Sequence, residues 1–355
     1  MHVTRKCTER GAVGWWTAVA VSASACSAGP APSHGPLAVR NQHPAQLTVM
    51  RLDPASPSVL PSGDTAVRAS TAYSSLFLGD SNATEAFAMD GELMRTSIQG
   101  RTGIGAGIEL TVELPVVHTS GGFLDGFLID YHDFFGFPDQ GRSVAPQNQF
   151  EVFAEQNGQT VWELREETLM LADVPVSATW CLVPPGRSAS GAGLPGLALR
   201  TGFELPTGDE SGGAGNGQFD YAAGLCASWP LAFGTLFADG QYTWAGTPDL
   251  ARSRSFAFGD VSAASLGLEV PLLSDFSSVA QLSWETSVLR NLDLDRANRD
   301  QVWLWLGARM RVDRQLFVEV VFGEDLSPYI APDFTLVLAM AWLPDQGSAW
   351  RGPRP

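Results

Sequence analysis

A strict alternation of large apolar residues with small or polar ones recurs along this chain and limits the folds open to it. In DFTLVLAMAW (333–342), every second residue from Phe334 to Trp342 is large and apolar. Because successive side chains of a β-strand point to opposite faces, such a stretch predicts a strand with one broad apolar face. Four further stretches with this alternation are residues 104–115, 197–206, 279–288 and 302–312.

Two kinds of protein accommodate such faces, a soluble β-sandwich or propeller in its core and a transmembrane β-barrel in lipid. Only 17% of the residues are charged, whereas about a quarter is usual in soluble domains. From residue 206 onward, tight connections such as Trp229-Pro230 alternate with long polar ones such as residues 207–217, as they do in outer-membrane barrels. No repeat of blade length supports a propeller. The pattern therefore favours the barrel.

We predict an all-β fold, a transmembrane antiparallel up-and-down β-barrel over residues 66–343, with one amphipathic helix in a long outer loop. Counting stretches along the chain gives about fourteen strands within an expected range of about 12–14, and sixteen also stays open.

The first 25 residues carry the pattern of a secretory signal peptide, in which basic residues precede an apolar run that ends in small residues at Ala25. Cleavage there would place Cys26 at the new N-terminus. Lipidation of Cys26 stays open, because Ala23 stands where bacterial lipoprotein signals usually have leucine. In either case we expect the protein to reach the bacterial outer membrane, inserted by the barrel-assembly machinery.

Two segments flank the predicted barrel. Residues 26–65 are rich in proline and lack long alternation, so we expect an N-terminal periplasmic segment or a plug of the barrel. Residues 344–355 are expected to form a C-terminal tail.

Charged residues of both signs fall on the inward face of the predicted strands. They either neutralise one another in pairs that fill the interior, or they create a field across a path with a mild preference for cations. These residues are Glu109, Glu113, Arg200, Glu204, Glu269, Glu285, Arg309, Arg311 and Glu319.

The segment GGFLDGFLIDYHDFFGFPDQGR (121–142) breaks the alternation, because its apolar residues recur at intervals of three and four. On a helix, most of them fall within an arc of about 140°. Two roles stay open for this outer-loop helix, a structural lid at the mouth of the barrel and a constriction or gate inside the lumen. The residues concerned are Phe123, Asp125, Phe127, Asp130, His132, Asp133 and Phe134.

A catalytic interpretation of the same segment has less support. Ser120, His132 and Asp125 are the residue types of a hydrolytic triad. However, His132 and Asp125 lie about two helical turns apart, too far for a direct hydrogen bond, and no G-x-S-x-G turn is present. We assign no catalytic residue.

The remaining composition excludes several other classes of site. Cys181 and Cys226 are predicted to face inward near the periplasmic ends of strands separated by one strand. Their backbones would then lie about 10 Å apart, beyond the reach of a disulfide, so both thiols should be free. The scattered histidines show no metal-ligand spacing, and we expect neither a metal nor a cofactor. The net charge of −16 argues against a nucleic-acid partner.

Three stretches resemble a known family, PLAVRNQHP (36–44), residues 121–142 and EDLSPYIAPDFTLVLAMAW (324–342). They are similar to an uncharacterised family of Gram-negative proteins that is catalogued as a domain of unknown function. The match is looser at PQNQF (146–150), because relatives often have arginine where Gln147 stands here. The resemblance implies an outer-membrane barrel and no established activity.

These observations predict an outer-membrane barrel of unknown substrate that acts as a narrow or gated channel for small solutes. Two alternatives stay open, a structural or assembly barrel with a filled lumen and an outer-membrane enzyme that acts on lipids. The expected partners are membrane lipid and a small-molecule solute.

Overall fold

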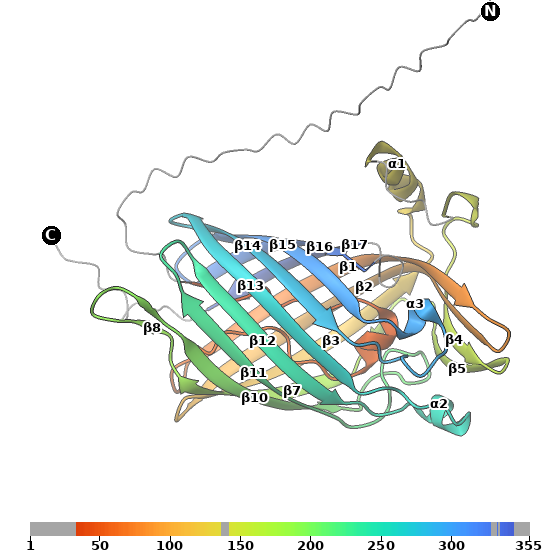
Figure 1. Cartoon of the computed structure of the whole chain (residues 1–355), viewed down its shortest axis with the longest axis horizontal. Coiled ribbons are helices and arrows are strands. Elements are labelled where there is room, and N and C mark those ends of the chain that lie inside the picture. Colours follow the sequence, from red (N-terminus) through yellow and green to blue (C-terminus); the bar gives the residue numbers. More distant parts are fainter. Residues whose placement is uncertain (1–32, 136–141, 328–331, 333, 344–355) are drawn as a thin grey trace, which may run out of the picture.

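The computed structural model describes residues 33–135, 142–327, 332 and 334–343. Twelve antiparallel strands close into a barrel, because β1 pairs with β17 as well as with β2 (Figure 1). The predicted fold class is therefore confirmed. The strands of the barrel wall are β1 (Thr65–Ser81), β2 (Glu85–Gly105), β3 (Ile108–Ser120), β7 (Val174–Val183), β10 (Gly196–Leu205), β11 (Asp220–Pro230), β12 (Thr235–Trp244), β13 (Val261–Leu273), β14 (Phe276–Glu285), β15 (Gln301–Arg311), β16 (Leu316–Asp325) and β17 (Phe334–Trp342).

The count of fourteen strands is too high, because one hairpin lies outside the wall. Its strands, β4 (Glu151–Gln156) and β5 (Gln159–Leu164), have six residues each, whereas a strand needs about 9–11 to cross a bilayer. β4 pairs with the first residues of β2, from Glu85 to Asp90, beyond the part of β2 that pairs with β3. The turn at Asn157-Gly158 has positive φ at both residues, as a tight two-residue hairpin requires.

The other described elements are short. Residues 104–115, predicted as one strand, instead contain the turn between β2 and β3, where Ala106 and Gly107 have positive φ. Among the described helices, none is long and apolar enough to cross a membrane. These elements are η1 (Pro44–Thr48), α1 (Asp125–Phe135), η2 (Arg142–Val144), β6 (Met170–Leu171), β8 (Gly186–Arg187), β9 (Gly193–Leu194), α2 (Asp249–Ser253) and α3 (Asp295–Asn298).

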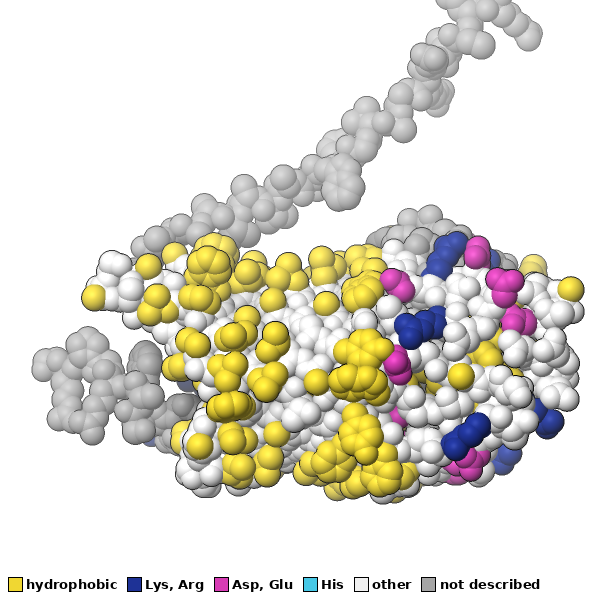
Figure 2. Space-filling model, turned by 60° about the horizontal axis from the view of Figure 1, so that its bottom comes forward, with side chains coloured by type: hydrophobic (Ala, Val, Ile, Leu, Met, Phe, Trp, Pro, Cys, Tyr) yellow, Lys and Arg dark blue, Asp and Glu magenta, His cyan; other side chains and the backbone are white. Residues whose placement is uncertain are grey.

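The outward face of the wall is apolar, as the alternation predicts. On β17, Leu336, Leu338 and Met340 are exposed, whereas Thr335 and Val337 are buried toward the interior. Figure 2 shows hydrophobic side chains over most of the wall, with charged side chains gathered at one end. An apolar band of this kind is typical of a wall that faces lipid.

The end of the alternating stretch 279–288 departs from this assignment. Val288 lies past the end of β14 and is fully buried under the loops.

The two ends of the barrel differ in the length of their connections. One end, the short-turn end, carries connections such as residues 231–234, 274–275 and 312–315. The other, the long-loop end, carries residues 121–173, 206–219, 245–260 and 286–300, with α1, α2, α3 and the β4–β5 hairpin (Figure 1). The predicted alternation of long and short connections is confirmed.

Candidate functional site in the barrel lumen

The lumen is occupied by residues 33–61, which we call the inner segment (Figure 1). It starts at the short-turn end, where the Ser33 hydroxyl donates a hydrogen bond to Glu269 (2.6 Å). It then runs along β14, turns through η1 near the long-loop end and returns along β12 and β11. The amide of Leu60 donates to Glu109 at the start of β3 (3.0 Å), so the segment enters and leaves at the same end of the barrel.

At the short-turn end, Arg309 of β15 holds the first leg of the inner segment. Its guanidinium donates to the carbonyl oxygens of Gly35 (3.0 Å) and Pro36 (3.3 Å). The same group forms ion pairs with Glu269 (3.2 Å) and Glu319 (2.5 Å). Because a buried charge is costly unless it is paired, these carboxylates are what permits an arginine here.

Two wall glutamines bind the backbone of the segment with both halves of their amides. Gln281 accepts from the Leu37 amide (3.0 Å) and donates to the Leu37 carbonyl (3.2 Å). Gln241 does the same with Leu52, at 2.8 and 2.7 Å. One glutamine therefore satisfies the two backbone groups of one residue on each leg, as a neighbouring strand would.

Near the long-loop end, Glu285 of β14 is the central acceptor. It receives hydrogen bonds from the side chains of Asn41 and Gln46 and forms an ion pair with Arg51, on the return leg. Gln46 also accepts from the amide of Val288 (2.9 Å). A single buried carboxylate thus ties together both legs of the inner segment.

The return leg is bound by β10, β11 and β12. The Met50 amide donates to Asp220 (2.9 Å), and the Thr243 hydroxyl donates to the Met50 carbonyl (3.0 Å). Further toward the short-turn end, Arg200 donates a hydrogen bond to the carbonyl of Asp53 (2.5 Å).

Apolar contacts complete the inner segment's surroundings. Trp303 and Trp305 stand on the inward side of β15, together with its polar residues, and are thus exceptions to the alternation of the stretch 302–312. Both are buried in the lumen, with ring centroids 5.1 Å apart, in one cluster with Leu37 and Val39. The exception in the alternation thus marks the place where the inner segment packs.

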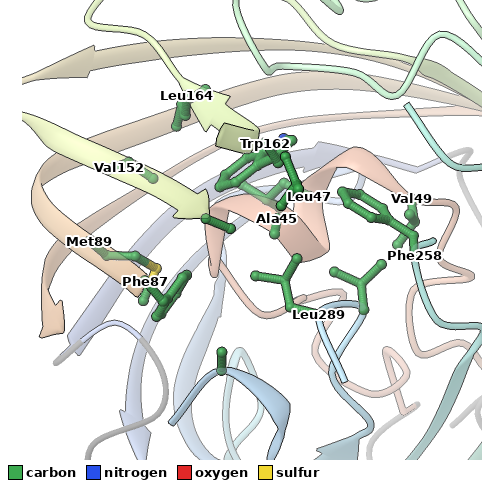
Figure 3. Packing of buried hydrophobic residues seen from close by; sticks show 14 of the residues in the cluster. Ala45, Leu47, Val49, Phe87, Met89, Val152, Trp162, Leu164, Phe258 and Leu289 are labelled. Carbon is green, nitrogen blue, oxygen red and sulfur yellow. The ribbon is translucent and has the colours of Figure 1, made fainter. Parts of the chain in front are cut away.

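The long-loop end holds the largest apolar cluster, which we call the outer cluster. Figure 3 shows η1 in its middle, with Ala45 and Leu47 pointing toward Trp162 of β5 and toward Leu289. The β4–β5 hairpin and the loops after β12 and β14 close over it. Its other labelled members are Val49, Phe87, Met89, Val152, Leu164 and Phe258.

The inner segment packs closely against one side of the lumen. A pocket of about 10 Å³ lies between residues 40–51 and the strands β12 to β14, which is about the room for one water molecule. Here the inner segment leaves little space next to the wall.

The structure places the predicted lumen charges as follows. Eight of the nine are buried, and Arg311 is half-buried at the short-turn end, where it pairs with Asp275 (3.1 Å). Glu113 pairs with Arg95 (3.0 Å) and Arg101 with Glu109 (2.9 Å). The remaining predicted charges are Arg200, Glu204, Glu269, Glu285, Arg309 and Glu319.

The loop helix, α1, lies outside the lumen, beyond the side of the barrel (Figure 1). Phe123, Phe127 and Phe134 are exposed, as are Asp130 and Asp133. The side chain of His132 is outside the described residues. Asp125 pairs with Arg142 and accepts from the amide of Asn148 (2.7 Å), so it holds the loop together rather than orienting a histidine.

Both thiols predicted to be free are free. Cys181 and Cys226 each pair in register with Ala198 of β10, which separates their strands. Among the described residues, no group of three or more histidine, cysteine or acidic side chains is arranged to hold a metal ion.

Several residues of the site are not identifiable from the alternation alone. Gln241, Gln281 and Asp220 lie at ordinary inward positions, and nothing in the local sequence sets them apart. Asn41 and Arg51 lie in a stretch with no strand pattern. A cluster of polar residues in 40–51, within a segment otherwise rich in proline, was the available signal.

A family profile covers most of the chain, since residues 15–342 match the family described as "Protein of unknown function (DUF3187)". The chain belongs to the DUF3187 family. This agrees with the resemblance noted for residues 36–44, 121–142 and 324–342. No curated protein matches the sequence.

Among solved structures, this DUF3187 protein is similar to the COG4313 outer membrane channel from Pseudomonas putida F1. The two share 12% identity over 82% of this chain and 100% of that chain, with a TM-score of 0.52. The NanC porin matches with 8% identity over 78% of this chain and 98% of that chain, at a TM-score of 0.42. The KdgM porin matches with 7% identity over the same shares, at a TM-score of 0.39. At such identities only the fold is shared, and the fold is that of an outer-membrane channel.

Proposed function

We propose that this DUF3187 protein is an outer-membrane channel for a small solute, closed in the present conformation by its inner segment. In outer-membrane barrels the short turns face the periplasm and the long loops face outward. With that orientation, the inner segment starts and ends on the periplasmic side. The barrel is surrounded by membrane lipid, and the barrel-assembly machinery is required for its insertion.

One observation carries the proposal, the way in which the inner segment is attached. It is bound by wall side chains, such as Gln241, Gln281, Glu285 and Arg309, rather than as a strand of the wall. Water can replace hydrogen bonds of this kind, so displacement costs far less than opening the barrel. A displaced segment would leave a lumen lined with charges of both signs.

The size of the barrel agrees with a narrow path. Eight strands fill their own interior with side chains, whereas sixteen to eighteen leave a wide aqueous channel. Twelve strands lie between these limits, and here the additional space is taken by the inner segment. The solute is therefore expected to be small.

Single-channel conductance in planar bilayers tests the proposal. We expect brief or no openings in the intact protein and a steady conductance after deletion of residues 33–61. Glu285→Gln removes one carboxylate that binds both legs and should increase the open fraction without a deletion. Asp239→Asn is the matched control, because Asp239 binds Ser265 on the neighbouring strand. A folded deletion variant that does not conduct would overturn the proposal.

A second candidate function is a structural barrel with a permanently filled lumen. The pocket of about 10 Å³ favours it. It predicts no conductance in the intact protein or in Glu285→Gln. A variant lacking residues 122–136 tests α1 separately, since unchanged conductance would leave this helix without a gating role.

A further inference from the structure

A stripe of exposed phenylalanines runs along α1 and the residues just before it. The side chains of Phe123, Phe127 and Phe134 are 73%, 60% and 83% exposed. At 100° per residue, Phe127 and Phe134 fall within about 20° of each other around the helix, and Phe123 lies two residues before its start. Phenyl groups gathered in this way on a helix indicate an interaction surface.

The base of α1 is fixed to the barrel wall by a buried carboxylate. Glu92 of β2 accepts hydrogen bonds from the amides of Phe123 (2.8 Å) and Leu124 (2.6 Å) and from the hydroxyl of Tyr73. Gly122 permits this approach, because a Cβ on it would lie 2.0 Å from the Glu92 side chain. The helix is therefore mounted at a defined place.

That place is the outward face of the wall. Along β2, Glu92 shares its face with Ile98, which is exposed to the surroundings of the barrel. Diagonally across from Glu92, Tyr73 lies on the outward face of β1, where it pairs in register with Leu336 of β17. The ring of Phe123 lies 6.2 Å from that of Tyr73, so the stripe begins where the apolar band ends.

The same level of the barrel carries other outward-facing aromatic residues. The rings of Phe322 and Phe334 stack at 6.3 Å beside the pairing partner of Tyr73. Tyrosine and tryptophan are typical of the boundary between lipid and water. Further aromatic residues near the long-loop ends of the strands are Phe203, Tyr221, Tyr242, Trp244 and Trp284.

We propose that α1 lies on the outer surface of the membrane, with the phenylalanine stripe inserted at the boundary between headgroups and acyl chains. Amphipathic helices bind membrane surfaces in this orientation. The helix carries the exposed Asp130 and Asp133 and no lysine or arginine, so insertion depends on the apolar stripe rather than on attraction to anionic lipid. Because the barrel holds the helix at the bilayer, even a weak affinity suffices.

This inference does not rest on the proposed transport function. A lid over the lumen or a contact with a second protein would also use an exposed stripe, but neither requires a mount on the lipid-facing side. The continuity between the stripe and the aromatic boundary of the wall favours lipid.

Depth-dependent fluorescence quenching tests the proposal in the full chain. Cys7, Cys26, Cys181 and Cys226 are replaced by serine, and an environment-sensitive fluorophore is attached to Phe127→Cys or, as the matched control, to Asp133→Cys. The folded proteins are inserted into phosphatidylcholine vesicles with brominated acyl chains. We expect strong quenching and a blue-shifted emission for the label at 127 and neither for the label at 133.

Equal quenching in vesicles that contain anionic phosphatidylglycerol would support insertion through the stripe. No quenching at position 127 would overturn the proposal and leave a lid or a protein contact. Equal quenching at positions 127 and 133 would overturn the assigned orientation. Conductance of the unlabelled protein is unaffected by these outcomes, so failure here leaves the channel proposal standing.

Discussion

The two ends of the lumen hold the same inner segment by different means. At the short-turn end, Arg309 with its partners Glu269 and Glu319 binds backbone carbonyls. At the long-loop end, η1 is surrounded by the outer cluster, and Leu47 packs among apolar side chains. The first end relies on groups that are costly to bury singly, whereas the second adds a large apolar surface removed from water to the contacts of Glu285.

This difference shows how one segment can be both specific and releasable. Paired charges and amide contacts determine which residue lies against which strand, because a misplaced partner leaves a buried charge alone. Apolar contacts tolerate small shifts and add stability without fixing register. We therefore expect the polar contacts to control how often the segment leaves the lumen, and the outer cluster to determine how completely it returns.

The largest effect is expected from Glu285→Ala, which leaves Arg51 without its partner. Removing one member of a buried pair costs about 3–5 kcal/mol, here from the docking of the inner segment. Trypsin cleavage after Arg40 and Arg51, followed by mass spectrometry, reports the fraction of open segment. Asp239→Ala is the control. Equal cleavage in both variants would show that the polar contacts do not control release.

A somewhat smaller effect is expected from Leu47→Ala in η1. Loss of a buried leucine side chain costs about 2–5 kcal/mol, and the cleavage should increase accordingly. Leu338→Ala changes an outward-facing leucine and should leave cleavage unchanged. If Leu47→Ala also left cleavage unchanged, the outer cluster would stabilise the loops and would not hold the inner segment in the lumen.

Substitution of the two backbone-binding glutamines sharpens the comparison further. Gln281→Leu and Gln241→Leu each leave a buried amide and carbonyl without partners, at a cost of about 1–3 kcal/mol for each variant. We expect intermediate cleavage in each single variant and additive effects in the double variant. Gln315→Leu, in an exposed turn, is the control. Strong cleavage in only one variant would mean that the two legs open separately.

The smallest effect is expected from acidification at the short-turn end. Burial is the main cause that lowers the pKa of His34 from 6.5 to about 4, and the charges of Arg309 and Arg311 lower it further. The carboxylates of Glu269 and Glu319 act in the opposite direction and raise it. A displaced His34 binds a proton more readily, so docking is disfavoured as the pH falls from 6.5 toward 4. The open fraction in planar bilayers should increase over that range.

His34→Phe provides the control for this effect, because it keeps a ring against Phe317 and does not titrate. An equal pH response in this variant would assign the effect to other groups.

The wall was predictable because it repeats. The alternation in DFTLVLAMAW and in residues 197–206 fixes which side chains face outward, and the positions of Cys181 and Cys226 follow from it. The number of strands was not predictable in this way. The strands of the β4–β5 hairpin alternate like those of the wall, and they differ from them only in their length and in pairing with the extension of β2.

The site was predictable only in part. Inward charges such as Glu285 and Arg309 follow from the pattern, but their partners in residues 33–61 do not, because these contacts span more than 200 positions of sequence. The position of α1 was missed because the residues that hold it lie on other elements, although the separation in sequence is only 31 positions for Glu92 and Phe123. Periodicity identifies the apolar side of α1. Glu92 and Tyr73, which hold the start of the helix outside the wall, belong to strands whose local sequence does not indicate this contact.

The course of the inner segment has a mechanical consequence. A chain that passed through the lumen from one end to the other could be removed only by drawing its free end along the whole barrel. The inner segment instead folds back on itself within the lumen, so that both of its limbs reach the same end of the barrel. Because Leu60 lies five residues before β1, the return limb is tethered to the wall, and a pull at the other limb would load the attachments one after another, beginning with that of Ser33.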